Sequence, residues 1–375
     1  MKKVGFIGWR GMVGSVLLER MKKKKNFEKI IPMFFSTTQK GKKIFLSNNK
    51  NKNTIEDAYN IDLLMSNDII VTCQGSYYTK KIYSKIRNNG WNGYWIDAAS
   101  YLRMKNDSTI VLDPINYDLI LKDIDNGIKN FVGGNCTVSL MLMSLGGLVK
   151  EKLIDWIYFS SYQAVSGAGA SAMLELIKQI KKISNNINIK HKLNFSTKNI
   201  LSIEKKITKI SQLKKYLPIN VFKIPIICNT IPWIDNKMEN GQTMEEHKSI
   251  SETNKILGYK KKKILVDGNC VRISALRCHS QSFMIHLKKD ISISSIYNII
   301  KNNNKWVNII PNEKEQTIEK LNPIKVSGTL NIPIGRIRKL NIGKKYISAF
   351  SVGDQLLWGA AEPIRRVLKI ILKNI

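Results

Sequence analysis

Three glycines near the N-terminus constrain the fold of this chain more than any other feature. Gly8, Gly11 and Gly14 follow a short apolar run, Lys3–Ile7, and open a helical pattern that continues to Lys24. Glycines at this spacing allow a tight turn and let the backbone approach a pyrophosphate, while the helix N-terminus offers free N–H groups and a partial positive charge. Strand, turn and helix in this order predict a dinucleotide-binding unit.

The rest of the chain divides into two regions of different pattern. Short apolar runs alternate with helical periods through residues 1–135, as a parallel sheet with crossover helices requires. Longer strand-like runs, Trp156–Val165 and Val271–Leu287, follow. We therefore predict an α/β protein: a doubly wound (Rossmann-like) dinucleotide-binding domain, residues 1–135, and a mixed α+β second domain, residues 136–355. We expect a C-terminal helix, residues 356–375, to pack back onto the first domain.

The end of the second predicted strand, Ile30–Phe35, indicates which dinucleotide binds. NAD-specific sites place an acidic residue there for the ribose 2′-hydroxyl, and that carboxylate would repel a 2′-phosphate. Here the strand is followed by Ser36, Thr37 and Thr38, and Arg10 stands in the glycine turn. Hydroxyl groups and a guanidinium suit a phosphate, so we predict NADP as the cofactor.

The charge balance raises a second function class, a basic nucleic-acid-binding protein. Lys and Arg number 61 against 28 Asp and Glu, which gives a net charge of +33, a range in which nucleic-acid binding has to be considered. Such binding needs basic residues clustered with aromatic ones on one face. The lysines are instead scattered over both halves, so we expect weak, salt-sensitive attraction and no specific complex.

Two features bear on where the protein functions. Phe131–Val149 carries no charge and is long enough to cross a bilayer, but its polar, glycine-rich first half favours a turn followed by a buried helix, so we expect no membrane insertion. The five cysteines are an odd number at irregular spacings without a CxxC pair. Neither a disulfide framework nor a metal site is therefore predicted, and a cytoplasmic location fits best.

Cys136 follows Gly133, Gly134 and Asn135 and begins an apolar helical pattern. A thiolate in the first turn of a helix is stabilised by the free N–H groups, which lowers the thiol pKa and makes the sulfur a nucleophile. The alternative is a small buried side chain without reactivity. We assign that role to the other four cysteines: Cys73, Cys228, Cys270 and Cys278.

A cysteine nucleophile of this kind needs a base, and the chain has four histidines. His191 and His247 lie in polar helical surroundings and His286 ends an alternating strand, whereas His279 stands seven residues after Arg272. We therefore predict His279 as the base. Residues at an odd offset face opposite sides of a flat strand, so the run has to bulge or break between Arg272 and His279 if both serve one site.

A nucleotide-binding unit followed by a Gly-Asn-Cys-Thr helix start resembles the phosphorylating aldehyde dehydrogenases. Over essentially its full length the chain is similar to the aspartate-β-semialdehyde dehydrogenases, and in particular to their Gram-negative bacterial branch. The resemblance is carried by VGFIGWRGMVGSVL, FFSTTQ, DIIVTCQG, GYWIDAAS, FVGGNCTVSLMLMSLGGL, IPWID, ETNKIL, VRISALRCHSQ and VGDQLLWGAAEP. A sister enzyme such as an acetylglutamyl-phosphate reductase is the nearest alternative, because only the residues that grip the substrate separate the two.

The resemblance implies an activity and its chemistry. The family interconverts L-aspartyl-4-phosphate and NADPH with L-aspartate 4-semialdehyde, phosphate and NADP, on the route to lysine, threonine, methionine and diaminopimelate. By this resemblance Cys136 attacks the aldehyde, the thiohemiacetal passes hydride to the nicotinamide, and phosphate opens the thioester. His279 acts as acid and base, and Gln163 holds the substrate beside the thiolate. The resemblance also implies a homodimer, with the second domain supplying the interface.

The resemblance also implies roles for the residues of this chain that match the other site positions of the family. Arg272 grips the substrate carboxylate and Glu245 its ammonium group, while Arg103 and Lys248 hold phosphate. The chemistry of the residues supports the role of Arg272 strongly, because a guanidinium can bind a carboxylate with two hydrogen bonds. The support for Glu245 and Lys248 is weaker and comes from their spacing, which places them on one helix face. The resemblance places the cofactor against residues of both domains: Gly8, Arg10, Gly11, Met12, Val13, Thr37, Thr38, Gln74, Ser166, Gly167 and Gln355.

A capping box is predicted at the start of the helix that carries Glu245. Thr243 and Glu246 have the required spacing. This pairing gives Glu246 a structural role and leaves Glu245 free for substrate. No cofactor contact is carried over to 185–202, where the sequence departs from the family pattern.

Overall fold

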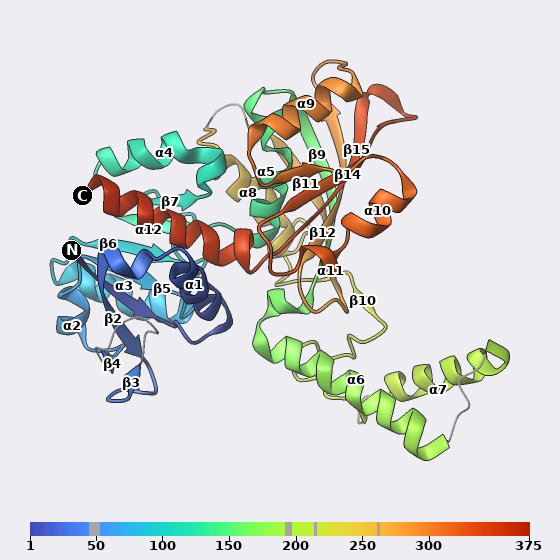
Figure 1. The fold of residues 1–375 in the computed structure, drawn as a ribbon, viewed down its shortest axis with the longest axis horizontal. Coiled ribbons are helices and arrows are strands. Elements are labelled where there is room, and N and C mark those ends of the chain that lie inside the picture. The colour runs from blue at the N-terminus through green and yellow to red at the C-terminus, as the bar shows by residue number, and fades with distance from the viewer. Residues whose placement is uncertain (45–52, 192–196, 214–215, 261–262) are drawn as a thin grey trace.

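The computed structural model describes residues 1–44, 53–191, 197–213, 216–260 and 263–375. Within these residues two sheets, of eight and seven strands, lie side by side, each accompanied by helices (Figure 1). The predicted fold class, a doubly wound α/β unit followed by a mixed α+β unit, is confirmed.

The first sheet has the strand order β3-β4-β2-β1-β5-β6-β8-β7, and its neighbouring strands are parallel except for the pair β3 and β4. β5 and β6 are buried at every position, which is why they read as continuous apolar runs rather than as alternating patterns. The strands are β1 (Lys2–Ile7), β2 (Ile30–Ser36), β3 (Lys43–Ile44), β4 (Asn53–Asp57), β5 (Ile69–Thr72), β6 (Tyr94–Asp97), β7 (Ser108–Val111) and β8 (Asn130–Gly133).

The helices that connect these strands bury one apolar stripe each. In α1 (Met12–Lys23) the stripe includes Leu17, Leu18 and Met21, which pack on Val4 and Phe6 of β1. The other helices of this unit are α2 (Ile61–Met65), α3 (Ser76–Asn88) and α4 (Asp113–Asp125).

The C-terminal helix α12 (Glu362–Asn374) crosses back to the first sheet (Figure 1). Its apolar side chains, including Ile364 and Val367, belong to the same core cluster as β1 and α1. The α-helix starts later than the predicted start at residue 356, because a π-helical turn covers Leu357–Ala361. Pro363 lies in the first turn of α12, where the missing N–H costs nothing.

The second sheet has the order β10-β11-β9-β12-β15-β14-β13. Its strands are β9 (Ile154–Gln163), β10 (Thr230–Ile231), β11 (Leu265–Ile273), β12 (His279–Leu287), β13 (Val307–Ile309), β14 (Ile332–Leu340) and β15 (Gly343–Gly353). Its helices are α5 (Cys136–Lys150), α6 (Ala170–His191), α7 (Ile200–Gln212), α8 (Met244–Ile256), α9 (Ile293–Asn303), α10 (Lys314–Lys320) and α11 (Pro323–Val326).

One face of the second sheet carries the largest core. α5, α8 and α9 supply side chains to this cluster, and nearly every residue of α5 is buried. The uncharged segment Phe131–Val149 is therefore a strand end, a turn and a buried helix, as its polar first half predicted. No helix among the described residues is long and apolar enough to cross a membrane.

The long run Val271–Leu287 is two strands rather than one. β11 ends at Ile273 and β12 begins at His279, so the predicted break between Arg272 and His279 is confirmed. β9 lies between the two strands, parallel to β11 and antiparallel to β12. The register pairs Arg272 with Gln163 and Ser280 with Tyr162, so Arg272 and His279 flank the end of β9.

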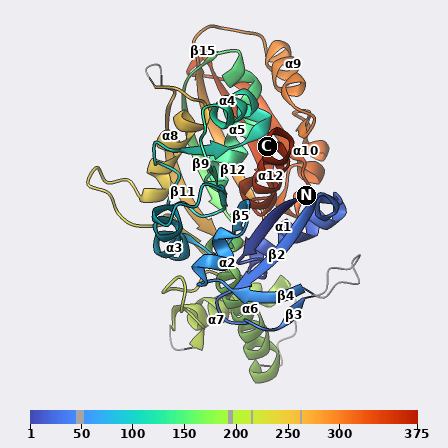
Figure 2. The ribbon, with the colours of Figure 1, turned by 90° about the vertical axis from the view of Figure 1, so that its left-hand side faces the viewer.

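Helices α6 and α7 extend as an arm away from both sheets (Figures 1 and 2). Residues 192–196, which connect the two helices, lie outside the described part of the chain.

Candidate active site

The predicted site residues surround two cavities. A cavity of about 630 Å³ is bordered by eleven of them: Met12, Val13, Arg103, Cys136, Gln163, Ser166, Gly167, Glu245, Lys248, Arg272 and Gln355. A second, of about 530 Å³, is bordered by six more: Gly8, Arg10, Gly11, Thr37, Thr38 and Gln74. The remaining predicted residue, His279, is fully buried and contacts Cys136.

Cys136 is the first residue of α5 and borders the larger cavity. The Asn135 side chain caps the helix by accepting hydrogen bonds from the N–H groups of Thr137 and Val138. Gly359 packs directly against the cysteine, since a Cβ at that position would lie 2.6 Å from Cβ of Cys136. Cys136 is therefore held by a capped helix start and by the turn that precedes α12.

His279 lies behind the cysteine. Its Nε2 atom is 3.5 Å from Sγ of Cys136, and the N–H of Ala164 donates to its Nδ1 atom over 3.1 Å. Because Nδ1 accepts, the proton of the neutral ring lies on Nε2 and points toward the sulfur. In this tautomer the ring can donate a hydrogen bond to a negative charge on Sγ of Cys136, or to a negatively charged oxygen of a group that is bonded to Sγ.

The electrostatics of this pair differ from the sequence expectation. Burial and the Glu245 carboxylate raise the pKa of the Cys136 thiol to about 11, against the opposing charges of Arg272 and Arg103. Burial and Arg272 lower the pKa of His279 to about 3. The prediction that the pKa of this thiol is lowered is therefore wrong, because burial in the protein interior disfavours the charged thiolate.

Gln163 ends β9 and is buried beside the nucleophile. Its Nε2 group donates to Oγ1 of Thr137 over 2.9 Å and lies 3.2 Å from Oε1 of Glu245. These contacts fix the amide between α5 and α8 and leave it at the cavity wall.

Arg272 brings a buried positive charge to the wall of the larger cavity. Its Nη1 donates to the carbonyl of Ala164 over 2.7 Å, and the residue is only 5% exposed. Among the described residues it forms no salt bridge, and burial lowers its pKa. A buried guanidinium without a carboxylate partner favours an anionic ligand, because such a ligand would offset the cost of burying the charge.

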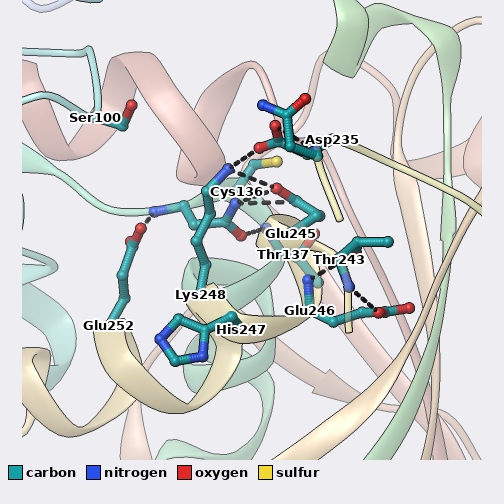
Figure 3. Close-up of polar contacts among 12 residues, drawn as sticks. Ser100, Cys136, Thr137, Asp235, Thr243, Glu245, Glu246, His247, Lys248 and Glu252 are labelled. Carbon is teal, nitrogen blue, oxygen red and sulfur yellow. Dashed lines mark hydrogen bonds and ion pairs between the residues drawn. The ribbon is translucent and has the colours of Figure 1, made fainter. Parts of the chain in front are cut away.

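Glu245 and Lys248 face the cavity from one side of α8 (Figure 3). Nζ of Lys248 is 3.2 Å from Oε2 of Glu245 and 2.7 Å from Oδ2 of Asp235. The lysine lowers the pKa of Glu245 despite burial, and Asn135 and Gln163 also donate to this carboxylate. Glu245 is thus ionised, and its negative charge lies at the wall of the cavity that Arg272 also borders.

Arg103 is held by two buried acceptors. Its Nε donates to the carbonyl of Gly133 over 2.7 Å, and its Nη1 lies 3.1 Å from Oε1 of Glu252. The other oxygen of Glu252 accepts from the N–H of Asn135 over 2.6 Å (Figure 3). The remaining N–H groups of the guanidinium are available at the cavity wall that Arg103 borders.

The predicted capping box at the start of α8 is confirmed. Oγ1 of Thr243 accepts from the N–H of Glu246, and Oε2 of Glu246 accepts from the N–H of Thr243. Glu246 is thereby occupied, as expected.

The glycine turn fits the requirements of a pyrophosphate site. Gly8 has φ of +71°, and a Cβ there would lie 2.5 Å from the backbone of Cys73 and Gln74. A Cβ on Gly14 would lie 2.3 Å from the carbonyl oxygen of Gly8, whereas at Gly11 the nearest atom would be 3.3 Å away. Gly8 and Gly14 are therefore required by packing, while Gly11 keeps the helix start open to a ligand.

Gln355 connects the second unit to the cofactor side of the larger cavity. Its Oε1 accepts from the N–H of Cys278 over 2.8 Å, and its Nε2 donates to Oγ of Ser166. These bonds hold Ser166 and the neighbouring Gly167 at the cavity, where a Cβ on Gly167 would lie 2.9 Å from Nη1 of Arg272.

Sequence reasoning missed Asn135, Asp235, Glu252 and Gly359. Glu252 had a signal, because it follows Glu245 by seven residues and so lies on the same helix face. Asn135 also had one, as a favoured cap residue immediately before an apolar helix. Asp235 and Gly359 lie in two segments that carry the family resemblance, IPWID and VGDQLLWGAAEP, but only the folded chain shows that they reach the site. The described residues contain no group of three or more His, Cys, Asp or Glu that could hold a metal ion.

Comparison with known proteins agrees with this arrangement. The family model described as "Semialdehyde dehydrogenase, NAD binding domain" matches residues 3–122, and the one described as "Semialdehyde dehydrogenase, dimerisation domain" matches residues 145–358. The solved aspartate semialdehyde dehydrogenase from Francisella tularensis is 49% identical over 99% of this chain and 100% of that one, with a TM-score of 0.92. The chain belongs to the aspartate semialdehyde dehydrogenase family.

More distant structures share the fold of this family. Aspartate semialdehyde dehydrogenase II from Vibrio cholerae, complexed with ASA, is 21% identical, with a TM-score of 0.81 over 100% of this chain and 99% of that one. An aspartate semialdehyde dehydrogenase with NADP from Candida albicans is 14% identical, with a TM-score of 0.67 over the whole of both chains. The two-unit architecture is thus retained where most residues have changed.

Proposed function

We propose that the protein catalyses the reversible, NADP-dependent reductive dephosphorylation of L-aspartyl-4-phosphate to L-aspartate 4-semialdehyde and phosphate. It is an oxidoreductase that acts on an aldehyde group, in the biosynthesis of lysine, threonine, methionine and diaminopimelate. The observation that carries the proposal is the grouping, around one cavity, of a cysteine–histidine pair, a buried unpaired arginine and an ionised glutamate.

The substrate has one carboxylate and one ammonium group, and the cavity offers one partner for each. Arg272 binds the carboxylate, since its guanidinium has no acidic partner among the described residues. Glu245 binds the ammonium group and Gln163 positions the reacting carbon. Together these three residues fix the substrate with its aldehyde directed at Cys136. A sister substrate whose amino group is acylated would lose the charge that Glu245 recognises.

Chemistry begins when Cys136, as the thiolate after its proton has passed to solvent, forms a bond from Sγ to the aldehyde carbon while the carbonyl electron pair moves onto the oxygen. His279 donates a hydrogen bond from Nε2 to the negative charge on sulfur and then on the adduct oxygen. The hydride of the adduct carbon would pass to the nicotinamide of NADP, which the glycine turn would hold, and a thioester on Sγ of Cys136 is left. A phosphate oxygen then attacks the thioester carbon, the carbon–sulfur bond breaks, and the thiolate is restored as the aspartyl phosphate leaves. Arg103 and Lys248 hold that phosphate.

The cofactor fits the chain at the glycine turn. The smaller cavity lies where the carboxyl ends of β1 and β5 meet, at the point where the strand order reverses. Gly8, Gly11 and the start of α1 would hold the pyrophosphate, and Arg10, Thr37 and Thr38 border the same cavity without an acidic residue. This lining supports NADP rather than NAD. Met12 and Val13 connect this cavity to the one that contains Cys136.

The protein acts as a homodimer formed through the second sheet. The face opposite its helices carries partly exposed aromatic side chains, among them Tyr158 and Tyr162 on β9 at 38% and 37% exposure. Trp156 and Tyr346 continue this aromatic surface. The match to a dimerisation domain over residues 145–358 supports a second copy of the chain as the partner that covers it.

A spectrophotometric assay tests the proposed function. Protein is mixed with aspartate semialdehyde and NADP, phosphate is added last, and absorbance at about 340 nm reports NADPH. We expect phosphate-dependent NADPH formation that is much weaker with NAD and absent with N-acetylglutamate semialdehyde. Equal or better turnover of the acetylated substrate would assign the protein to the sister activity instead.

A further inference from the structure

The two phosphate-binding cations of the proposed site each have an acidic partner, but the partners differ in burial. Asp235, one of the two acidic partners of Lys248, has a side chain that is 33% exposed, whereas the side chain of Glu252, the partner of Arg103, is 3% exposed. Burying a carboxylate in the protein interior costs free energy unless each of its oxygens accepts a hydrogen bond or pairs with a positive charge. Glu252 meets this condition with the Arg103 guanidinium on one oxygen and the Asn135 N–H on the other.

These two contacts connect parts of the site that have different roles. Arg103 follows β6 and borders the cavity, and Asn135 is the cap residue directly before Cys136. Arg103 also donates to Gly133 of the same loop. Glu252, Arg103 and residues 133–135 therefore form a closed ring of hydrogen bonds with the nucleophile at its edge.

We propose that Glu252 is a positioning residue that sets the distance between the phosphate-binding guanidinium and the thioester formed on Cys136. The inference rests on the proposed function, in which Arg103 holds the attacking phosphate. Neither oxygen of Glu252 is left to contact a ligand, so it acts only through its two partners. Attack requires the phosphate oxygen near van der Waals distance of the carbonyl carbon, and a displacement of about 1 Å can cost on the order of 100-fold in rate.

Two substitutions separate position from charge. Glu252→Gln keeps the length of the side chain but has one acceptor oxygen for two donors, so one bond of the ring is lost. Glu252→Asp keeps the charge but is shorter by one methylene, so it cannot reach both partners. We expect each variant to raise the KM for phosphate about tenfold or more, with the KM for aspartate semialdehyde changed less than twofold. Glu319→Gln, an exposed helical carboxylate, is the matched control.

A double-mutant cycle tests whether Glu252 acts through Arg103. If it does, Glu252→Gln has little further effect on kcat/KM for phosphate once Arg103→Lys is present. Additive losses, or a Glu252→Asp variant with the wild-type KM, would overturn the inference. Thermal melts and NADPH binding show whether each variant is folded.

Binding of inorganic phosphate, followed by ³¹P line broadening, keeps this test independent of turnover. Weaker phosphate binding by Glu252→Gln supports the inference even if the wild type lacks the proposed activity. Unchanged phosphate binding and unchanged KM in an active wild-type background would contradict the inference and leave the proposed function standing.

Discussion

At the residue scale, the buried surroundings of Cys136 affect the pKa of its thiol more than its position in the first turn of the helix does. The first turn of a capped helix stabilises a thiolate, which sequence alone could predict. Burial and the nearby Glu245 raise the thiol pKa to about 11 instead. That outcome depends on residues far apart in the chain, so no local pattern reveals it. In the proposed reaction the ammonium group of the substrate neutralises Glu245, which favours the thiolate only once the substrate is bound.

This predicts the pH dependence of alkylation in the unliganded protein. Both members of the pair are uncharged at neutral pH, because the His279 pKa lies near 3 and the Cys136 pKa near 11. The thiolate fraction therefore rises about tenfold per pH unit between pH 7 and 9. The rate of iodoacetamide labelling of the Cys136 peptide, measured by mass spectrometry, should rise likewise. A plateau already reached at pH 7 would indicate a thiolate–imidazolium pair and contradict this account.

At the element scale, residue patterns within a segment predicted its local structure correctly. The positions at which elements begin and end were predicted less accurately. The odd offset between Arg272 and His279 predicted the break that separates β11 from β12, because side-chain alternation is a strict consequence of strand geometry. The Thr243–Glu246 spacing likewise predicted the cap of α8. The start of α12 was placed too early, because the π-helical turn that precedes it has no local signature that distinguishes it from helix.

The site residues likewise divide into those that the sequence predicted and those that only the folded structure reveals. Residues whose chemistry is rare in the chain, such as Cys136, were predicted from the sequence, and most of the proposed substrate contacts came from the family resemblance. Glu252 and Asp235 were not found, because their role comes from partners brought near by folding. The boundaries of the two domains also stay predictions, although α12 packs in the core of the first sheet.

A pair of alanine substitutions tests the two uses of glycine in the first turn. Gly14→Ala places a methyl group against the Gly8 carbonyl and the Trp9 backbone, so we expect a loss of about 1–3 kcal/mol in the free energy of unfolding. Gly11→Ala meets only one atom, at 3.3 Å, so the fold should be retained while the methyl group weakens NADP binding about tenfold.

Chemical denaturation and NADP titration check both glycine variants. Equal losses of stability would show that the two glycines do not have separate roles. Unchanged NADP affinity in the Gly11→Ala variant would contradict the proposal that the cofactor binds at this turn.

At the whole-molecule scale, the sheet of the second unit borders the candidate active site and also carries the face proposed as the dimer interface. β9 ends in Gln163 at the cavity and presents Tyr158 and Tyr162 to the opposite face. An interface formed on that face would therefore lie directly behind the substrate site. The net charge of +33 does not supply the function in this account, since the proposed site uses a few buried charges and no specific nucleic-acid complex is expected.

Sedimentation tests the proposed interface. Wild-type protein should sediment as a dimer, and a variant with Tyr158→Lys and Tyr162→Lys should sediment as a monomer, because charged side chains oppose burial in an apolar interface. Tyr77→Lys, at a tyrosine that is 77% exposed on α3, is the control and should remain dimeric. A double variant that stays dimeric would place the interface elsewhere.

The central claim is that Cys136 carries the acyl group between hydride transfer and phosphorolysis. The most direct measurement mixes the protein with aspartate semialdehyde and NADP in the absence of phosphate. The account predicts a burst of NADPH close to one per active site and an aspartyl group on the Cys136 peptide in the mass spectrum, with adduct lost and turnover resumed when phosphate is added. NADPH formation without an adduct, or an undiminished burst in Cys136→Ala, would contradict the account.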